Sequence, residues 1–343
     1  MKPTTIAVDL AKSVFQVAVS HRPGHVTEQH RLSRARLVPF FAQQPPSVVL
    51  LEACGSAHHW ARQFSRLGHT PVLLPAHDVH RYVQGNKTDQ ADAKALLEAF
   101  RNEDIHPVPI KSLDQQALAA LHRLRSASLA TRTARLNTLR GILREFGLVI
   151  PIGARNVLPA VRVVSHDTES VVPPVLRLAL EDAAHEIADL EERIGLLEHQ
   201  IRSLARQSPA VQRLLTVPGI GWLTATALVA FIGNVHRFPS ARHFASYLGL
   251  TPREFSSGAV RRLGRISKRG DVYLRMLLIH GARAVLWAAK SQKQPDRLRA
   301  WALEIERLRG HNKAAVALAN KLARIAWVVW RKEQDFEEVS IAA

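Results

Sequence analysis

The chain has 343 residues, enough for about two or three domains, and its 47 Lys and Arg against 29 Asp and Glu give a formal net charge of +18. This excess favours a polyphosphate partner over a merely basic surface, and the single cysteine, Cys54, excludes an internal disulfide and fits a reducing cytoplasm. No signal-peptide pattern opens the chain, and apolar runs such as 272–289 are broken by Arg and His, so we expect no membrane span.

The first hundred residues alternate strands and helices. The expected elements are strands at 4–11, 14–21, 25–33, 47–54 and 69–76, and helices at about 35–43, 57–68 and 89–101. The first two strands should form a hairpin around Ala11–Ser13, and the later apolar strands suit a buried parallel sheet. A hairpin followed by strand–helix–strand units predicts a mixed sheet with packed helices. This order is that of a ribonuclease-H-like fold.

The middle of the chain, 114–206, is expected to be mostly helical, with the Val- and Pro-rich segment 148–173 as a connector. Apolar residues then alternate spacings of three and four over about four heptads, which predicts a coiled coil; they are Leu180, Ala183, Ile187, Leu190, Ile194, Leu197, Ile201 and Leu204. The pattern leaves open whether the partner helix belongs to the same chain or to another copy. Ser208-Pro209 should end this helix.

A third, helical region spans 210–332 and carries most of the charge excess. Residues 208–343 hold 22 Lys and Arg against 9 Asp and Glu. VPGIG (217–221) lies between two helical stretches, and its glycine N–H groups could hold a phosphate in a helix-hairpin-helix element, although an ordinary turn is the alternative. Further helices are expected at 271–290 and 312–332. We place boundaries after residues 108, 208 and 335, the last before an acidic tail of 336–343.

Four acidic residues sit where a two-metal nuclease would need them. Asp9 and Glu52 end two strands, and Asp89 and Asp92 lie three apart on one helix face. Like charges at short range are costly without a cation, and two Mg²⁺ ions would serve phosphoryl transfer. In the alternative reading, Thr88 or Asp89 caps a helix and Asp92 pairs with a lysine. The combination favours catalysis.

The segment 248–271 combines a serine pair, Ser256-Ser257, with a dense group of cations. Five cations follow within ten residues: Arg261, Arg262, Arg265, Lys268 and Arg269. A serine there could attack a phosphodiester once a metal or base activates it, while the cations hold the DNA backbone. An ordinary loop explains the serines equally well on chemistry alone. Cys54 is interpreted as a buried small residue.

Taken together, these motifs resemble a known family. Asp9, Glu52, the K-T-D-x-x-D-A of 87–93, VPGIG and the 248–271 block occur in this order. The combination resembles the DEDD transposases of bacterial insertion sequences, which are RNA-guided recombinases, from about residue 4 to 330. The resemblance implies a RuvC-like domain over 1–108, a coiled-coil region over 109–208 and a C-terminal transposase domain over 209–335 with a catalytic serine. By motif match, Asp9, Glu52, Asp89 and Asp92 bind two Mg²⁺ (or Mn²⁺) ions, and Ser257, beside Ser256, is the nucleophile.

The resemblance also implies partners. They are a structured noncoding guide RNA, donor and target double-stranded DNA, and further copies of the chain in a tetramer, or dimer of dimers, with 180–204 as a protomer contact. Such a protein works in the bacterial cytoplasm, at the nucleoid, and no membrane is expected. The expected nucleic-acid contacts are Gly219, Gly221, Arg253, Arg261, Arg262, Arg265, Lys268, Arg269, Arg123, Arg132 and Arg135.

Two rival functions remain. In one, the protein is a RuvC-type junction nuclease in which water attacks and Ser257 is structural. In the other, it is a basic helix-hairpin-helix protein that binds nucleic acid without cleaving it. A covalent protein–DNA adduct would separate the first rival from recombination, and metal-dependent cleavage would exclude the second.

Overall fold

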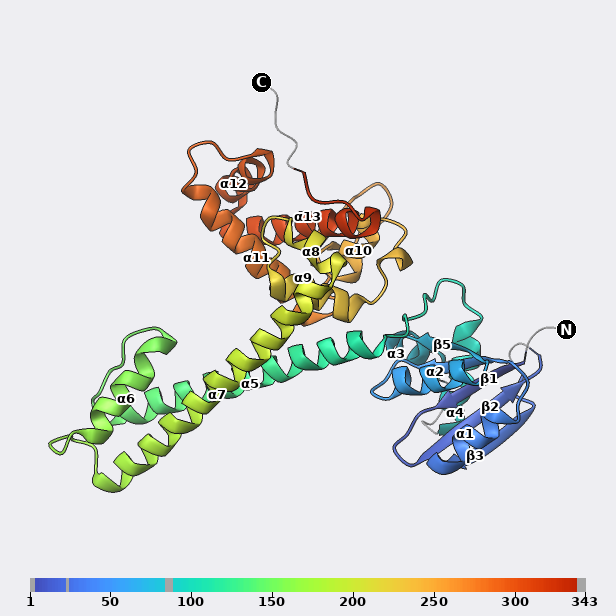
Figure 1. Ribbon diagram of the computed structural model, residues 1–343. Helices are drawn as coiled ribbons and strands as arrows, with labels where there is room; N and C mark the ends of the chain where they lie inside the picture. The colour runs from blue at the N-terminus through green and yellow to red at the C-terminus, as the bar shows by residue number, and fades with distance from the viewer. Residues whose placement is uncertain (1–3, 23–24, 84–88, 338–343) are drawn as a thin grey trace. The chain divides into compact units, whose positions relative to one another are not determined.

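A computed structural model of the protein describes residues 4–22, 25–83 and 89–337, apart from the side chains of Asp89 and Gln90. Internal contacts divide the chain into two compact units, Met1–Ser112 and Leu113–Ala343. Figure 1 shows the sheet of the first unit and the helices of the second. The sequence prediction of an N-terminal mixed sheet and a mostly helical remainder is therefore confirmed.

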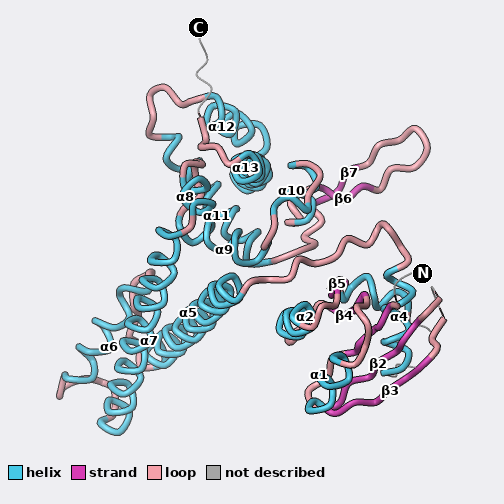
Figure 2. Tube along the Cα trace, turned by 45° about the vertical axis from the view of Figure 1, so that its right-hand side comes forward, coloured by secondary structure: helices cyan, strands magenta, loops and turns pink. Residues whose placement is uncertain are grey.

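The first unit is built on a five-stranded sheet with the strand order β3-β2-β1-β4-β5. Its strands are β1 (Thr5–Asp9), β2 (Val14–Ser20), β3 (Glu28–Ser33), β4 (Val48–Glu52) and β5 (Thr70–Leu74). The first three strands pair antiparallel, whereas β4 lies parallel to both β1 and β5. Figure 2 shows these strands in magenta. The predicted hairpin followed by parallel strands is confirmed.

Helices cover both faces of this sheet because its central strands are apolar on both sides. The helices of the unit are α1 (Arg34–Ala42), α2 (Ala57–Arg66), α3 (Ala76–Val79) and α4 (Asp89–Phe100), with a 3₁₀ turn η1 at His80–Tyr82. Ile6, Val8 and Leu51 belong to the core under α1 and α2. Ala7 and Leu50 belong to a second core, on the α4 side. Successive residues of each strand thus point to opposite cores.

The second unit begins with a long helical hairpin. Its helices are α5 (Leu113–Glu145), α6 (Val157–His166) and α7 (Pro174–Gln207). α5 packs along α7, and a buried row on α7 repeats every seven residues as Leu180, Ile187, Ile194 and Ile201. The partner of this part of the heptad pattern is therefore a helix of the same chain. Leu190 and Leu197 are half-buried, and Leu204 is 37% exposed.

The segment 148–173 connects α5 and α7 as predicted, but it also contains helical structure that the sequence analysis did not predict. It holds a 3₁₀ turn η2 at Ala154–Asn156 and the helix α6. Val157 and Val161 are four residues apart and fully buried beside α7, which is helical spacing. Pro159 falls in the first turn of α6, where its missing N–H costs no hydrogen bond. Ser208-Pro209 ends α7 as predicted.

The remainder of the second unit is a helical core. Its helices are α8 (Pro209–Leu215), α9 (Trp222–Ile232), α10 (Ala241–Tyr247), α11 (Val272–Lys290), α12 (Arg297–Arg309) and α13 (His311–Lys332), with a 3₁₀ turn η3 at Val235–Arg237. The buried face of α13 is rich in alanine, for example Ala315, Ala319 and Ala323. Small side chains let α10, α11 and α12 pack closely against it.

The helical region also contains a β-hairpin, where the sequence led us to expect helices joined by a loop. Strands β6 (Pro252–Glu254) and β7 (Leu263–Ile266) pair antiparallel. At the far end, Ser257 and Val260 exchange two backbone hydrogen bonds of 3.2 Å each. Gly258 between them has a φ of +57°. Glycine at the first central position is what a two-residue type II′ turn requires. Figure 2 shows the hairpin as a projecting ribbon.

Within the described residues, α11 is the helix whose length and composition would let it cross a membrane. In this fold it packs against α9, α12 and α13. Its Arg275 is buried and donates hydrogen bonds to the carbonyl oxygens of Leu248 and Arg269, at 3.2 and 3.1 Å. α11 is therefore a core helix of the second unit.

Candidate active site

Two acidic residues stand side by side at one edge of the sheet. Val8 of β1 is paired with Leu51 of β4, so Asp9 and Glu52 occupy the next positions of two parallel neighbours. Each lies two residues beyond a residue of the α4-side core, Ala7 and Leu50. Because side chains alternate along a strand, both carboxylates leave the sheet on the side of α4. Both residues are half-buried.

The third described carboxylate comes from α4 itself. α4 packs on β1, β2 and β4. Asp92 is half-buried in its first turn, one residue before Ala93 and four before Leu96, which are buried in the α4-side core. Residues four apart share a helix face, so Asp92 lies on the face turned toward the sheet. Asp89 begins α4; its side chain, like all of Thr88, lies outside the described residues.

In the parts of the chain that the structure describes, no group of three or more His, Cys, Asp or Glu residues could hold a metal ion. Asp9, Glu52 and Asp92 nevertheless supply the oxygen ligands that Mg²⁺ prefers, from two strand ends and a facing helix. The donor chemistry fits a divalent cation. Binding by the full quartet stays a prediction.

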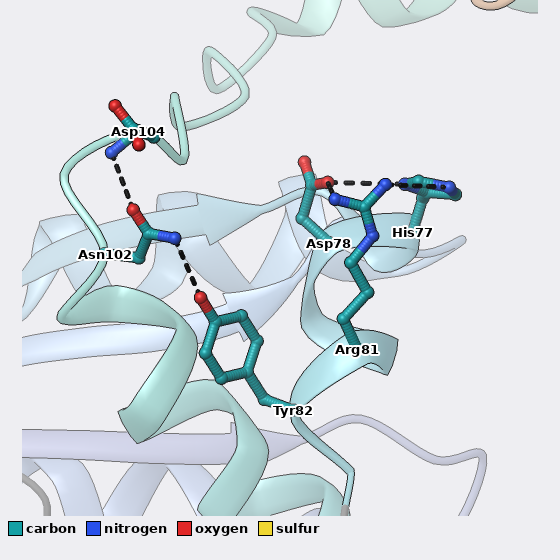
Figure 3. A network of polar contacts seen from close by, with 6 residues as sticks. All are labelled: His77, Asp78, Arg81, Tyr82, Asn102 and Asp104. Carbon is teal, nitrogen blue, oxygen red and sulfur yellow. Dashed lines mark hydrogen bonds and ion pairs between the residues drawn. The ribbon is translucent and has the colours of Figure 1, made fainter.

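A polar network holds the chain on the approach to α4. The Nδ2 of Asn102 donates to the Tyr82 hydroxyl at 2.8 Å, and the Oδ1 of Asn102 accepts from the backbone N–H of Asp104 at 2.9 Å (Figure 3). Asp78 forms an ion pair with Arg81 at 3.7 Å. Tyr82 ends η1, and Asn102 follows α4. The network therefore fixes η1 against the C-terminal end of the helix that carries Asp92.

The serine pair lies on the hairpin of the second unit, and its two hydroxyls differ sharply. The Ser256 hydroxyl donates to Oε1 of Glu254 at 2.6 Å and accepts from the backbone N–H of Arg262 at 3.1 Å. Ser257 is exposed at the turn, and the described residues offer its hydroxyl no hydrogen-bond partner. Ser256 thus braces the two strands, whereas Ser257 presents a hydroxyl to solvent.

Two glycines fix the base of the hairpin by close backbone contact. A Cβ on Gly249 would lie 2.0 Å from the carbonyl oxygen of Arg269, and one on Gly270 would lie 1.9 Å from that of Tyr247. Both glycines have positive φ. Buried Arg275 donates to the Arg269 carbonyl oxygen at the same place. Sequence reasoning missed Arg275 and Glu254 as positioning residues. Arg275 binds backbone carbonyl oxygens, and Glu254 binds the side chains of Ser256 and Arg261; no local sequence pattern marks either set of contacts.

The predicted cations cluster around this hairpin. Arg253, Arg261, Arg262, Arg265, Lys268 and Arg269 are all exposed. Arg261 forms a 3.6 Å ion pair with Glu254, and Arg253 donates to the carbonyl oxygen of Ser267 at 3.3 Å. Lys268 has a φ of +54°. These exposed cations lie along the hairpin that carries Ser257 and at its base, and their contact with nucleic acid stays a prediction.

The first glycine of the VPGIG turn, Gly219, is explained by close packing against α11. A Cβ on Gly219 would lie 2.8 Å from the carbonyl oxygen of Gly281 and 2.7 Å from Cγ2 of Val285, both on α11. Gly219 is therefore needed for close approach to α11. Gly221 caps α9 and has open space around it. Phosphate binding at the start of α9 stays a prediction, which Gly221 suits better than Gly219.

Two of the three predicted α5 contacts are engaged within the helical hairpin. Arg132 forms an ion pair with Glu191 at 3.5 Å, and Arg135 forms one with Glu186 at 2.9 Å. Arg123 is exposed and lies over the Phe231 ring at 6.0 Å. The charges of Arg132 and Arg135 therefore hold α5 to α7, and nucleic-acid contact by these residues stays a prediction.

A buried histidine joins α5 to two other helices of this unit. His122 is fully buried; its Nδ1 lies 3.0 Å from the Tyr273 hydroxyl and its Nε2 lies 3.0 Å from Oγ1 of Thr226. Burial lowers the pKa of His122 to about 4, and nearby Arg125 adds to the effect. The residue is a neutral structural link at neutral pH. The sequence pattern of α5 does not predict that His122 is buried between polar partners, because Tyr273 and Thr226 are distant in the sequence.

Comparison with known proteins identifies the chain. Residues 211–297 match the Transposase IS116/IS110/IS902 family, and residues 6–147 match a transposase model of the DEDD and IS110 type. The chain is 44% identical to a probable family 20 transposase of Pseudomonas aeruginosa, covering 97% of this chain and 98% of the relative. It is 36% identical to the transposase for insertion sequence element IS1111A of Coxiella burnetii, covering 96% and 90%.

A more distant relative is named for a different role. The pilin gene-inverting protein of Moraxella bovis is 31% identical over 156 residues, covering 43% of this chain and 46% of the relative. The end-to-end matches place the chain in the class of insertion-sequence transposases. Within that class, it belongs to the IS110/IS116 family.

Proposed function

We propose that the protein is an RNA-guided recombinase of its insertion sequence, in which Ser257 attacks a DNA phosphodiester. The observation that carries the proposal is the contrast between the two serines. The Ser256 hydroxyl is used inside the hairpin, whereas the exposed Ser257 hydroxyl has no hydrogen-bond partner among the described residues. A nucleophile has to reach its phosphorus atom from a hydroxyl that other bonds leave available.

The bonds of this step balance without a further reactant. The Ser257 Oγ forms an ester with phosphorus as one bridging P–O bond of the strand breaks. The proton lost by Ser257 is matched by the proton gained by the leaving deoxyribose hydroxyl. A hydroxyl of another strand then attacks the phosphoserine, which rejoins DNA and restores Ser257. Because the ester keeps the energy of the phosphodiester bond, strand exchange needs no external energy source.

The acidic edge supports a metal-dependent version of this chemistry. Its sheet order, antiparallel then parallel, fits a ribonuclease-H or RuvC-like fold. Asp9, Glu52 and Asp92, together with Asp89, would hold one or two divalent cations. Bound Mg²⁺ would lower the pKa of an attacking hydroxyl and offset charge on the phosphate. The carboxylate oxygens of these acids would be the metal ligands, and the strand ends and α4 place them at one edge of the sheet.

The charge of the second unit supports nucleic-acid partners. Residues 208–343 carry 22 of the 47 Lys and Arg, and one exposed group of them, between Arg253 and Arg269, lies on the hairpin and at its base. A guide RNA would supply sequence recognition by base pairing while the protein contacts backbones. Donor and target DNA, a tetrameric assembly and action at the bacterial nucleoid belong to the same proposal.

The rival reading is a nuclease in which water attacks. The gene-inverting role that the Moraxella relative is named for favours recombination, because gene inversion rejoins strands whereas hydrolysis leaves them cut. A binding protein without catalysis is disfavoured by the paired carboxylates at neighbouring strand ends, which a phosphate-binding surface alone would not need.

The test is to trap a covalent adduct. The purified protein would be incubated with Mg²⁺, labelled DNA carrying the ends of its element, and RNA transcribed from the flanks of its gene, then run on a denaturing gel. We expect a protein-linked label that Ser257→Ala abolishes and that Ser256→Ala, the matched control, retains. Cleavage without an adduct would favour the nuclease, and an adduct mapped to Ser256 would refute the assignment of Ser257.

A further inference from the structure

A groove of about 880 Å³ lies at the base of the serine hairpin, between its strands and the helices α12 and α13. β7 contributes Arg265 and Ile266, α12 contributes Trp301, and a stripe along α13 completes the wall. The α13 residues are Asn312, Lys313, Val316, Ala317, Asn320, Lys321 and Arg324. The Nδ2 of Asn320 donates to the carbonyl oxygen of Leu250 at 3.1 Å, which ties α13 to the chain entering the hairpin.

The charge of this groove is unbalanced. Arg265, Lys313, Lys321 and Arg324 line it, and no Asp or Glu does. Among the described residues, none of these four cations takes part in an ion pair. Burial lowers the pKa of Lys321, and the charges of Arg297 and Arg324 add to this. Lys321 is half-buried, whereas Arg265, Lys313 and Arg324 are exposed, and a cation at a half-buried position without an ion-pair partner favours binding of an anion.

The floor of the groove is apolar and aromatic. The Nζ of Lys321 lies 4.1 Å from the centroid of the Trp301 ring, and Ile266 and Val316 are half-buried beside it. A cation next to an aromatic face is the arrangement that receives a nucleobase together with its phosphate. In a duplex the base faces are already stacked on one another, so an aromatic floor suits an unpaired strand.

We propose that this groove holds an unpaired stretch of the DNA strand that flanks the phosphodiester attacked by Ser257. The inference rests on the proposed function for its choice of DNA. Pro252 and Arg265, which line the groove, belong to the strands that carry the serine turn. Ser257 pairs across the turn with Val260, which is five positions before Arg265, roughly 17 Å along an extended strand. A strand leaving the serine would therefore run along the hairpin into the groove.

Binding can be measured apart from the chemistry. Anisotropy of a labelled oligothymidylate 20-mer would be followed in a Ser257→Ala background, which cannot form an adduct. Lys321→Gln with Arg324→Gln removes two groove cations. Arg309→Gln with Lys332→Gln is the matched control, because it removes two exposed cations of α12 and α13 that do not line the groove. We expect the groove pair to flatten the log–log salt slope by about 1.4, at about 0.7 per phosphate contact, and the control pair to change it less.

Trp301 tests the base-stacking part. Trp301→Leu keeps an apolar side chain against the core and removes the ring, so it should weaken oligothymidylate binding by about 5- to 150-fold. A thermal melt of the same variant checks that the fold is retained, and Trp301→Phe should restore part of the affinity. If Trp301→Leu and the Lys321→Gln, Arg324→Gln double variant both bind oligothymidylate with wild-type affinity, the groove is not the binding site, whatever the adduct assay shows.

Crosslinking decides between DNA and RNA. In the wild-type complex with guide RNA, thiothymidine placed in the DNA flank should crosslink to peptides containing residues 297–324. Thiouridine placed in the RNA should not. A crosslink from RNA alone at these peptides would overturn the assignment to DNA. Failure of the adduct assay with intact single-strand binding would instead refute the serine mechanism and leave the groove standing.

Discussion

The sheet edge and the serine hairpin present the side chains that we propose to be catalytic in opposite ways. Asp9 and Glu52 sit at the ends of strands whose preceding residues are buried on both faces. Ser257 sits on a ribbon whose residues from 252 to 265 are all exposed. The carboxylates are positioned by strand register and a packed core, whereas the serine is positioned by a turn and by the glycine contacts at the ribbon base.

The difference fits the chemistry that we propose for each part. Carboxylates that share a cation must be held together against their own repulsion, which needs a rigid support. A nucleophile that attacks a bulky polymer must instead be reachable. We therefore expect substitutions at the sheet edge to remove recombination activity with little loss of nucleic-acid binding. Substitutions in the hairpin should instead fall into two groups, those at exposed positions that affect only DNA contact and those at its base that also lower stability.

Removal of one carboxylate should have the largest effect. Asp9→Asn or Glu52→Gln keeps the side-chain shape and removes a charge, so adduct formation and strand exchange should fall by at least about 10³-fold while nucleic-acid binding persists. Asp104→Asn, an exposed acid of the same unit, is the control. Recombination at wild-type level by Asp9→Asn would remove the sheet edge from the active site.

Two positions on α7 allow buried and partly exposed residues to be compared on one helix. Ile194→Asp places a carboxylate in the contact with α5, where Ile194 is 6% exposed, and should cost about 4 kcal/mol or more of unfolding free energy. Leu197→Asp, half-buried three residues on, should fold. Light scattering of Leu197→Asp then tests protomer contact: an unchanged mass would show that this stripe does not join copies.

The glycine contacts that mount the hairpin predict a loss of both stability and activity. Gly270→Ala adds left-handed strain of about 1–2 kcal/mol and a Cβ 1.9 Å from the Tyr247 carbonyl oxygen. Gly258→Ala carries similar strain but meets nothing within 4 Å. Thermal melts should show the larger drop for Gly270→Ala. Equal drops would mean that the base contact contributes nothing beyond strain.

The buried histidine predicts how stability depends on pH. Unfolded His122 takes up a proton near pH 6.5, whereas the folded group does so near pH 4. The unfolded state therefore binds more protons between these values, and stability should fall as the pH drops from about 6.5 toward 4, by at most about 3 kcal/mol. Urea titrations of His122→Gln should show a shallower fall, with exposed His199→Gln as the control.

The smallest expected effect is on the exposed cations near the serine. Arg261→Gln with Arg262→Gln removes charge from the ribbon without touching its core. The log–log salt slope of duplex binding should fall by about 1.8, at about 0.9 per phosphate contact. Thermal stability should hardly change, because both side chains are exposed. An unchanged slope would show that this part of the cluster does not meet the DNA backbone.

Much of the architecture was predictable because it depends on short-range patterns. The apolar runs IAV and VVLL fixed β1 and β4 as buried strands, and with them the strand-end positions of Asp9 and Glu52. The heptads predicted α7. The helix α6 was missed because Val and Pro are read locally as helix-breaking, whereas burial of Val157 and Val161 beside α7 outweighs that preference.

The sequence by itself determined the residue types, their order and the charge excess, which were enough to recognise the acidic set and the serine block. The tertiary structure decided what no local pattern contains: that the main heptad row packs within the chain, that Gly219 is required by Gly281, and that Ser256 is engaged while Ser257 is exposed. The physical reason is that each of these depends on contacts with backbone atoms or helices distant in the sequence, which exist only once the chain is packed.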